Sequence, residues 1–277
     1  MASKKYRELK DILEDVRFSD NGNEVCFVTI GDASTSEGYF WEVLNAACVQ
    51  QVPLVINVWD DGYGISVPKE LQTTKGSISE IVKGFETTDD ISSLKIIKVK
   101  GWDYPALVKA YKESIQEVRE KHIPLLIHVE EMTQVQGHST SGSHERYKSL
   151  ERLDWEKEYD CNAQMRSWML EKQLATEEEL LLIENESKDY VKQEQKKAWD
   201  EFYGTIQEEI KLAIDYLEAL YEKTAYKEEL KEILKTLKYG IEPTRKDILK
   251  TIHEVLVLTI TEKSSAKDQL IQWYKEI

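Results

Sequence analysis

Two short polar segments contain the residues whose types and spacing suit metal and phosphate chemistry. The first, Gly31-Asp32-Ala33-Ser34, follows an apolar run and precedes a helical stretch. Small residues let a backbone approach a phosphate, a helix N-terminus offers free amides, and an aspartate beside them suits Mg²⁺. The alternative for this stretch alone is an ordinary turn between a strand and a helix, which is the more common case.

The second segment, Asp60-Asp61-Gly62-Tyr63, places Asp61 29 residues after Asp32. Mg²⁺ takes oxygen ligands in octahedral geometry and usually keeps water and phosphate in its shell. Two side chains and one backbone carbonyl therefore suffice, and Asp32, Asp61 and the Tyr63 carbonyl fit that need. The alternative is an acidic turn with ordinary turn chemistry.

Alternating strands and helices predict how these segments are positioned. Apolar runs predict strands, and amphipathic stretches predict helices between them, with strands at 25–30, 54–58, 94–99 and 124–129 and helices at 37–51 and 104–121. The strands are continuously apolar, as in a parallel sheet covered on both faces. Because open α/β sheets bind ligands at the carboxyl ends of their strands, both polar segments are expected to face one crevice.

The second half of the chain predicts helices. We expect an α/β domain at 1–150 and a helical region at 151–277. A capping-box pattern at 176–179 precedes a helix, and apolar residues from Trp199 to Leu220 recur every three or four positions. Such a stripe needs a partner surface. Gly240 and Pro243 interrupt the pattern, and Thr244 begins a last helical segment to about residue 253.

Composition excludes several classes of function. The net charge of −15 argues against nucleic-acid binding, which depends on concentrated Lys and Arg. Three scattered cysteines predict neither disulfides nor a zinc site and suit a reducing cytosol. The absence of a signal peptide and of a long apolar stretch predicts a cytoplasmic protein that does not contact a membrane. The sequence contains no G-x-x-x-x-G-K-[ST] loop and no G-x-G-x-x-G after a strand, which disfavours a nucleotide-binding protein.

Several motifs together resemble one enzyme family. They are Gly-Asp-Ala-Ser-Thr-Ser-Glu-Gly at 31–38, Phe-Trp-Glu at 40–42, Asn-Ala-Ala at 45–47, Val-Pro-Leu at 52–54, Ile-Ser-Val-Pro at 65–68, Gln-Thr at 72–73 and Gly-His-Ser-Thr-Ser at 137–141. They resemble the α-subunits of branched-chain 2-oxo acid and pyruvate dehydrogenases, strongly over 24–148 and more weakly to 197. The resemblance implies an α/β fold with the parallel sheet of thiamine-diphosphate-binding proteins, incomplete at its N-terminus, followed by a mostly α-helical C-terminal region.

The resemblance also implies roles for individual residues. Asp32, Asp61 and the Tyr63 carbonyl would bind Mg²⁺, and the diphosphate would lie against the cofactor-binding residues Gly31, Ala33 and Ser34. His138 would sit over the cofactor and is the catalytic candidate; the alternative is a structural histidine. The chain departs from the family where Ala33 replaces a glycine and Asp60-Asp61 replaces Asn-Asn. The metal site is therefore expected to hold more carboxylate, and still to bind Mg²⁺.

By the same resemblance, the complete enzyme uses thiamine diphosphate and Mg²⁺ to decarboxylate a 2-oxo acid, and passes the acyl group to a lipoyl carrier. The motif at 137–141 favours a branched-chain substrate, with pyruvate next. Ser139, Ser141 and Ser143 are interpreted as hydrogen-bonding residues that order their loop. The implied partners are a β-type subunit, or a β half of the same polypeptide, and a lipoyl-bearing acyltransferase, in an oligomer.

The resemblance leaves parts of the family's site unmatched. A section upstream of the cofactor-binding strand and an activating glutamate have no counterpart here. We therefore expect a piece of a longer polypeptide, inactive by itself, whose helical tail leads into a β-type half. The alternative is an assembly or interaction module without catalytic function.

Overall fold

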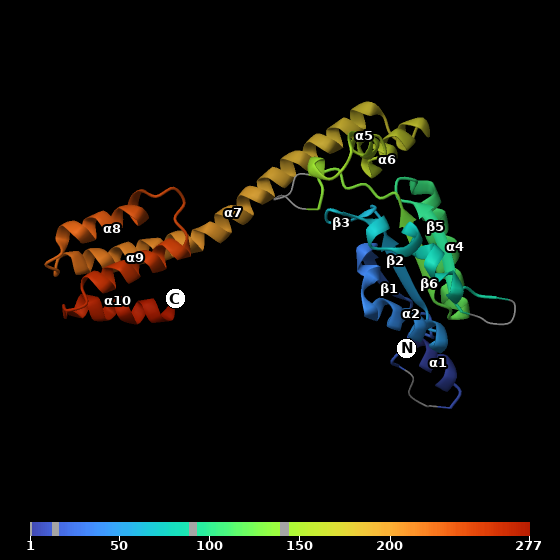
Figure 1. Cartoon of the computed structure of the whole chain (residues 1–277), viewed down its shortest axis with the longest axis horizontal. Helices are drawn as coiled ribbons and strands as arrows, with labels where there is room; N and C mark the ends of the chain where they lie inside the picture. Colours follow the sequence, from blue (N-terminus) through green and yellow to red (C-terminus); the bar gives the residue numbers. More distant parts are fainter. Residues whose placement is uncertain (1, 13–16, 89–92, 139–143) are drawn as a thin grey trace. The chain divides into compact units, whose positions relative to one another are not determined.

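The computed structural model of the chain describes residues 2–12, 17–88, 93–138 and 144–277, which form two compact units. Unit 1 is Met1–Glu177 and unit 2 is Glu178–Ile277 (Figure 1). The predicted domain boundary at residue 150 stays a prediction. It coincides with the first residue of α5 (Leu150–Glu158), and all the described strands precede it.

A parallel sheet organises unit 1. Its four strands are β1 (Cys26–Gly31), β2 (Leu54–Trp59), β5 (Lys95–Lys100) and β6 (Leu125–Glu130), in the order β1-β2-β6-β5. Helix α2 (Gly38–Gln50) connects β1 to β2, and α4 (Tyr104–Lys121) connects β5 to β6. The predicted α/β fold with a parallel sheet is confirmed, and each predicted strand is observed within one residue of its expected limits.

Residues at the two ends explain why α4 forms where it does. The Asp103 side chain accepts a hydrogen bond from the Ala106 amide at 3.0 Å, and Pro105 lies in the first turn, where its missing amide costs nothing. At the other end, His122 has a φ of 55° and ends the helix in the left-handed conformation.

Alternate strand residues supply two hydrophobic cores, one on each face of the sheet. Ile56 and Val58 of β2 pack with residues of α2 such as Leu44, whereas Val55 packs in the cluster that contains Val118 of α4. This alternation follows from the two-residue repeat of a strand. Both faces of the central strands are therefore buried, as the apolar runs predict.

Strand β1 differs from this expectation. Phe27 and Val28 are 51% and 40% exposed, although their sequence is as apolar as that of the buried strands. Among the described strands, β1 pairs with β2 alone, so its other edge is open. Its position in the sheet, and not its composition, causes this exposure.

Short elements complete unit 1. After β2, β3 (Tyr63–Gly64) and β4 (Val67–Pro68) pair as an antiparallel hairpin. The remaining helices are α1 (Ala2–Leu9), η1 (Ala33–Ser36), η2 (Lys69–Leu71), η3 (Thr74–Gly76), α3 (Ile78–Ile81), η4 (Val82–Phe85), η5 (His144–Arg146), α5 and α6 (Cys161–Glu171). The two residues of β3 line the predicted site, and Arg152 of α5 contacts the Asp61 carbonyl just before β3.

Unit 2 is helical, as predicted. It contains α7 (Glu177–Tyr221) except for its first residue, α8 (Lys227–Tyr239), α9 (Arg245–Leu258) and α10 (Ser265–Glu276) (Figure 1). The stripe from Ile206 to Leu220 is buried against α8, α9 and α10, whereas Trp199 and Phe202 are exposed. Thr244 caps α9 through a capping box with Asp247, so the predicted start of this helix is confirmed. The prediction that it is the last helical segment and ends near residue 253 is wrong, because α9 continues to Leu258 and α10 follows it.

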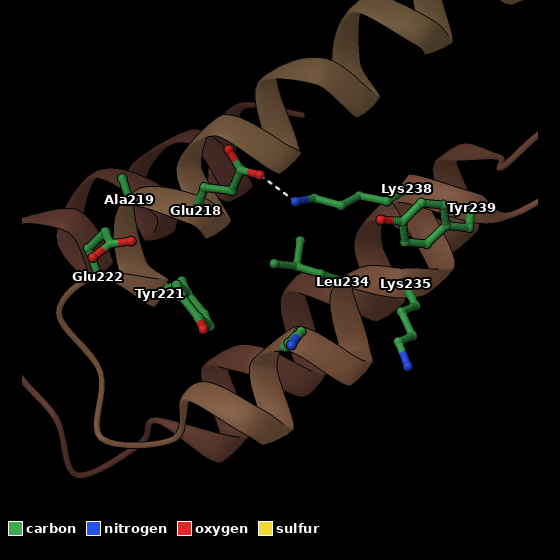
Figure 2. Close-up of a pocket in the computed structure, with 9 residues that line it drawn as sticks. Glu218, Ala219, Tyr221, Glu222, Leu234, Lys235, Lys238 and Tyr239 are labelled. Atoms are coloured by element: carbon green, nitrogen blue, oxygen red, sulfur yellow. Dashed lines mark hydrogen bonds and ion pairs between the residues drawn. The ribbon is translucent and has the colours of Figure 1, made fainter.

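A groove of about 660 Å³ lies between α7 and α8 (Figure 2). An ion pair between Glu218 and Lys238 spans it, and Leu234 and Tyr221 form part of its wall (Figure 2).

Among the described helices, none combines the length and apolar character needed to cross a membrane.

Candidate functional site

The ends of β1, β2 and β6 meet at one edge of the sheet and carry the predicted site. Parallel pairing places Gly31 beside Trp59 and Trp59 beside Val129, so the loops after these strands are neighbours. A cleft of about 600 Å³ opens there. It is lined by all seven predicted site residues: Gly31, Asp32, Ala33, Ser34, Asp61, Tyr63 and His138.

One carboxylate oxygen of Asp32 is buried in this cleft without a hydrogen-bond donor among the described residues. The residue is only 6% exposed, and its buried Oδ2 atom accepts no hydrogen bond from any residue that the structure describes. Burial, followed by the negative charges of Asp60 and Asp61, raises the pKa of Asp32 to about 7. A buried oxygen without a donor, beside other carboxylates, is the environment that a bound cation would stabilise.

Asp61 is the second carboxylate of the cleft. Its Oδ1 accepts a hydrogen bond from the Tyr63 amide at 3.2 Å, and its Oδ2 lies 3.2 Å from His138 Nε2. Burial raises the pKa of Asp61 above its usual range, although the charge of His138 and the Tyr63 amide act in the opposite direction. His138 therefore contacts a predicted metal ligand directly, and it shares the cleft with Asp32.

Asp60 has a different environment from its neighbour. It does not line the cleft; its Oδ2 accepts hydrogen bonds from Lys69 Nζ and His128 Nε2, both at 2.9 Å, and its Oδ1 accepts one from the Gly62 amide. Burial opposes ionisation, but the bonds from His128 and Lys69 outweigh it and lower the pKa of Asp60. His128 Nδ1 also lies 2.9 Å from Ser79 Oγ.

We call Asp60, Lys69, Ser79 and His128 the Asp60 cluster. The expected surplus of carboxylate at the metal site is therefore smaller than the Asp60-Asp61 pair suggests, because protein partners neutralise Asp60. Sequence reasoning missed the other three members. They come from η2, α3 and β6, and no local pattern pairs residues that only the fold brings together.

Ala33, the other departure from the family pattern, fits against a glycine. A Cβ atom built on Gly64 would lie 2.9 Å from the Ala33 Cβ and 2.5 Å from Gln72 Nε2. The absence of a side chain at Gly64 therefore makes room for the Ala33 methyl group. By contrast, a Cβ on Gly31 would meet no atom within 4 Å, so the cleft is open beside Gly31.

The described residues do not contain a self-sufficient metal site. Within residues 2–12, 17–88, 93–138 and 144–277, no group of three His, Cys, Asp or Glu side chains is placed to hold a metal ion. A site with two carboxylates and one carbonyl would need oxygens from water or from a phosphate. The residues after His138, including Ser139, Ser141 and Ser143, lie outside the described residues.

Comparison with known proteins identifies the family. The model of the dehydrogenase E1 component family matches residues 1–207, more than half of the chain. The chain therefore belongs to the dehydrogenase E1 component family, whose members generally depend on thiamine diphosphate.

Individual relatives agree with this assignment. The pyruvate dehydrogenase E1 component subunit alpha of Rickettsia bellii is 26% identical over 171 residues, 62% of this chain and 50% of the relative. The mitochondrial 2-oxoisovalerate dehydrogenase subunit alpha 2 of Arabidopsis thaliana is 31% identical over 149 residues, 53% of this chain and 30% of the relative. The mitochondrial 2-oxoisovalerate dehydrogenase subunit alpha of Mus musculus is 27% identical over 184 residues, 66% of this chain and 38% of the relative.

These findings confirm the predicted resemblance to α-subunits of 2-oxo acid dehydrogenase E1 components. The chain spans about half the length of the Rickettsia relatives. The family match ends at residue 207, so most of unit 2 lies beyond it.

Proposed function

We propose that this chain is the α part of an E1 component that decarboxylates a 2-oxo acid with thiamine diphosphate and Mg²⁺. The observation that carries this proposal is the buried Oδ2 of Asp32, which has no hydrogen-bond partner among the described residues and lies in a cleft that also contains Asp61 and Tyr63. An uncompensated buried carboxylate costs free energy, and a resident Mg²⁺ would remove that cost.

The residues of the cleft have two proposed roles, metal binding and diphosphate binding. Asp32, Asp61 and the Tyr63 carbonyl hold Mg²⁺, and the loop of Gly31, Ala33 and Ser34 lies against the diphosphate. Thiamine diphosphate, when bound, supplies the carbanion chemistry that decarboxylation of a 2-oxo acid requires. The open space beside Gly31 suits a close approach of phosphate.

His138 is the catalytic candidate of the proposal. This role is supported by the His138 ring lining the cleft, with Nε2 3.2 Å from Oδ2 of the proposed ligand Asp61. A cation or hydrogen-bond donor at this position stabilises negative charge on the diphosphate or on the bound acid.

We assign the acyl acceptor to a lipoyl carrier and the rest of the active site to a β-type subunit or β half. The oligomer that contains both is part of this proposal. A branched-chain 2-oxo acid is the favoured substrate, on the motif at 137–141, with pyruvate next. Reconstituted enzyme offered 2-oxoisovalerate and pyruvate in competition decides between them: a higher kcat/KM for pyruvate would contradict the branched-chain assignment.

The first test is calorimetric titration of thiamine diphosphate into the chain, with and without Mg²⁺, alone and mixed with a candidate β partner. We expect binding that requires Mg²⁺. Binding only with the partner would indicate a site completed between chains. No binding in any mixture would contradict the proposal and leave the interaction-module alternative.

Substitutions at the two carboxylates sharpen this test. Asp32→Ala and Asp61→Ala are each expected to abolish Mg²⁺-dependent binding. Asp61→Asn keeps an oxygen ligand and is expected to weaken binding much less than Asp61→Ala. Equal losses in both Asp61 variants would contradict coordination by the Asp61 side chain.

A further inference from the structure

Arg152 of α5 reaches the turn that contains two of the proposed metal ligands. Its Nη2 atom donates a hydrogen bond of 2.7 Å to the backbone carbonyl of Asp61, across 91 residues of sequence. No feature of the sequence predicts this contact, because α5 follows the end of the sheet. The bond fixes the peptide between Asp61 and Gly62 from outside the cleft.

Arg152 is itself held in place by a buried ion cluster. Its Nε donates to Glu156 Oε1 at 2.8 Å, and Lys148 Nζ bonds both carboxylate oxygens of Glu156 at 2.7 and 2.9 Å. The side chains of Lys148 and Glu156 are 0% and 1% exposed. Two cations thus share one carboxylate, which leaves a net positive charge directed at the turn.

Both cations also contact the aromatic ring of Tyr63. Lys148 Nζ lies 5.0 Å and Arg152 Cζ 5.5 Å from the ring centroid, within the range of cation–π attraction. The ring of Tyr147 packs against the same residue, with the centroids 5.7 Å apart. These contacts hold the Tyr63 side chain in place, and Tyr63 is the residue whose backbone carbonyl is a proposed ligand.

Gly62 of the turn contacts two charged side chains. Gly62 has a φ of 83°, and a Cβ built on it would lie 3.9 Å from Arg152 Nη2, so the guanidinium packs beside its Cα. The Gly62 amide also donates to Asp60 Oδ1 at 2.8 Å. The turn is therefore bonded both to Arg152 and to the Asp60 cluster, and Mg²⁺ tolerates little departure from octahedral geometry.

We infer that Arg152 is a positioning residue: through the Asp61 carbonyl and the Tyr63 ring it holds the 60–63 turn in the geometry that binds Mg²⁺. This inference rests on the proposed function, and it assigns Arg152 no contact with cofactor or substrate. Partners that orient metal ligands typically change metal affinity ten- to a hundredfold when they are removed.

Two measurements on the full chain test the inference, with Arg152→Gln as the variant. Lys157→Gln on the same helix is the matched control, since the Lys157 side chain is 69% exposed. The first measurement is amide hydrogen exchange of a peptide covering 59–64 without ligands. The second is titration of Mg²⁺ at fixed thiamine diphosphate, with the β partner if wild-type binding requires it.

We expect Arg152→Gln to speed exchange at 59–64 at least severalfold, to leave exchange in β6 unchanged, and to weaken Mg²⁺ binding about ten- to a hundredfold. Lys157→Gln should match the wild type in both. Wild-type Mg²⁺ affinity in Arg152→Gln would overturn the inference. Equal acceleration in β6 would also overturn it, because the role would then be general stability.

The two proposals fail in different ways. If the wild-type chain shows no Mg²⁺-dependent binding, the proposed function is contradicted, whereas exchange at 59–64 still decides whether Arg152 holds the turn. Unchanged exchange in Arg152→Gln would overturn the inference whatever the cofactor does.

Discussion

The Asp60 cluster and the cleft around Asp32 lie at the same edge of the sheet, and both combine carboxylates with histidine. In the cluster, Asp60 has three donors at 2.8 to 2.9 Å. In the cleft, Asp32 keeps a buried oxygen without a donor among the described residues. The described residues thus complete the hydrogen bonds of Asp60 but not those of Asp32, whose free oxygen Mg²⁺ would bind on the proposed function.

The largest effect on stability is expected from a substitution in the Asp60 cluster. Asp60→Asn removes the charge that Lys69 and His128 share, so it should destabilise the chain by about 3–5 kcal/mol, the usual cost of removing one partner of a buried ion pair. Urea unfolding at pH 7 measures this. The exposed Asp154→Asn is the control and should change the free energy of unfolding by less than about 0.5 kcal/mol.

In the absence of ligands, Asp32→Asn should increase the free energy of unfolding, whereas Asp60→Asn should decrease it. The pKa of Asp32 is raised from 3.8 to about 7 in the folded state, so the folded chain binds the extra proton between these values and loses stability as the pH rises through them. Removing the carboxylate should therefore stabilise the chain at pH 8 by on the order of 3 kcal/mol.

The gain from Asp32→Asn should disappear at pH 4, where the carboxyl of the folded wild type is protonated. Urea unfolding of both proteins from pH 4 to pH 8 checks this. A variant less stable than the wild type at pH 8, in Mg²⁺-free buffer, would show that Asp32 is satisfied by the protein and would remove the contrast with Asp60.

Glycine substitutions at the cleft distinguish a packed wall from an open one. Gly64→Ala places a methyl group against Gln72 and Ala33, so it should cost about 1–3 kcal/mol of stability. Gly31→Ala meets no atom within 4 Å and should leave the stability within about 0.5 kcal/mol, while weakening binding of thiamine diphosphate. Thermal unfolding and calorimetry measure the two effects. Equal stability losses would contradict the open space beside Gly31.

At His138, the expected change in stability is smaller than at Asp60, Asp32 or Gly64. Its contact with Asp61 is at 3.2 Å and its side chain is 26% exposed, so His138→Gln should change the free energy of unfolding by less than about 1 kcal/mol. If His138 acts at the cofactor, kcat of the reconstituted enzyme falls far more than stability does. A loss of stability comparable to that of Asp60→Asn would indicate a structural histidine.

The sequence by itself determined the parallel sheet and the helices between its strands, because hydrophobic periodicity reflects local burial directly. It also placed Asp32 and Asp61 at one crevice, since parallel strands end at the same edge. The buried part of the stripe on α7 and the start of α9 at Thr244 were equally local signals.

Only the tertiary structure decided which of two adjacent aspartates faces the cleft. Asp60 and Asp61 are identical in type, and they differ in their contacts. Lys69 and His128 bond the Asp60 side chain, Arg152 bonds the Asp61 carbonyl, and all three residues come from separate elements. Strand β1 shows the same limit, because Phe27 is as apolar as a buried residue and is exposed only by its place at the edge. Contacts across 68 and 91 residues, such as His128 to Asp60 and Arg152 to Asp61, leave no local pattern in a sequence.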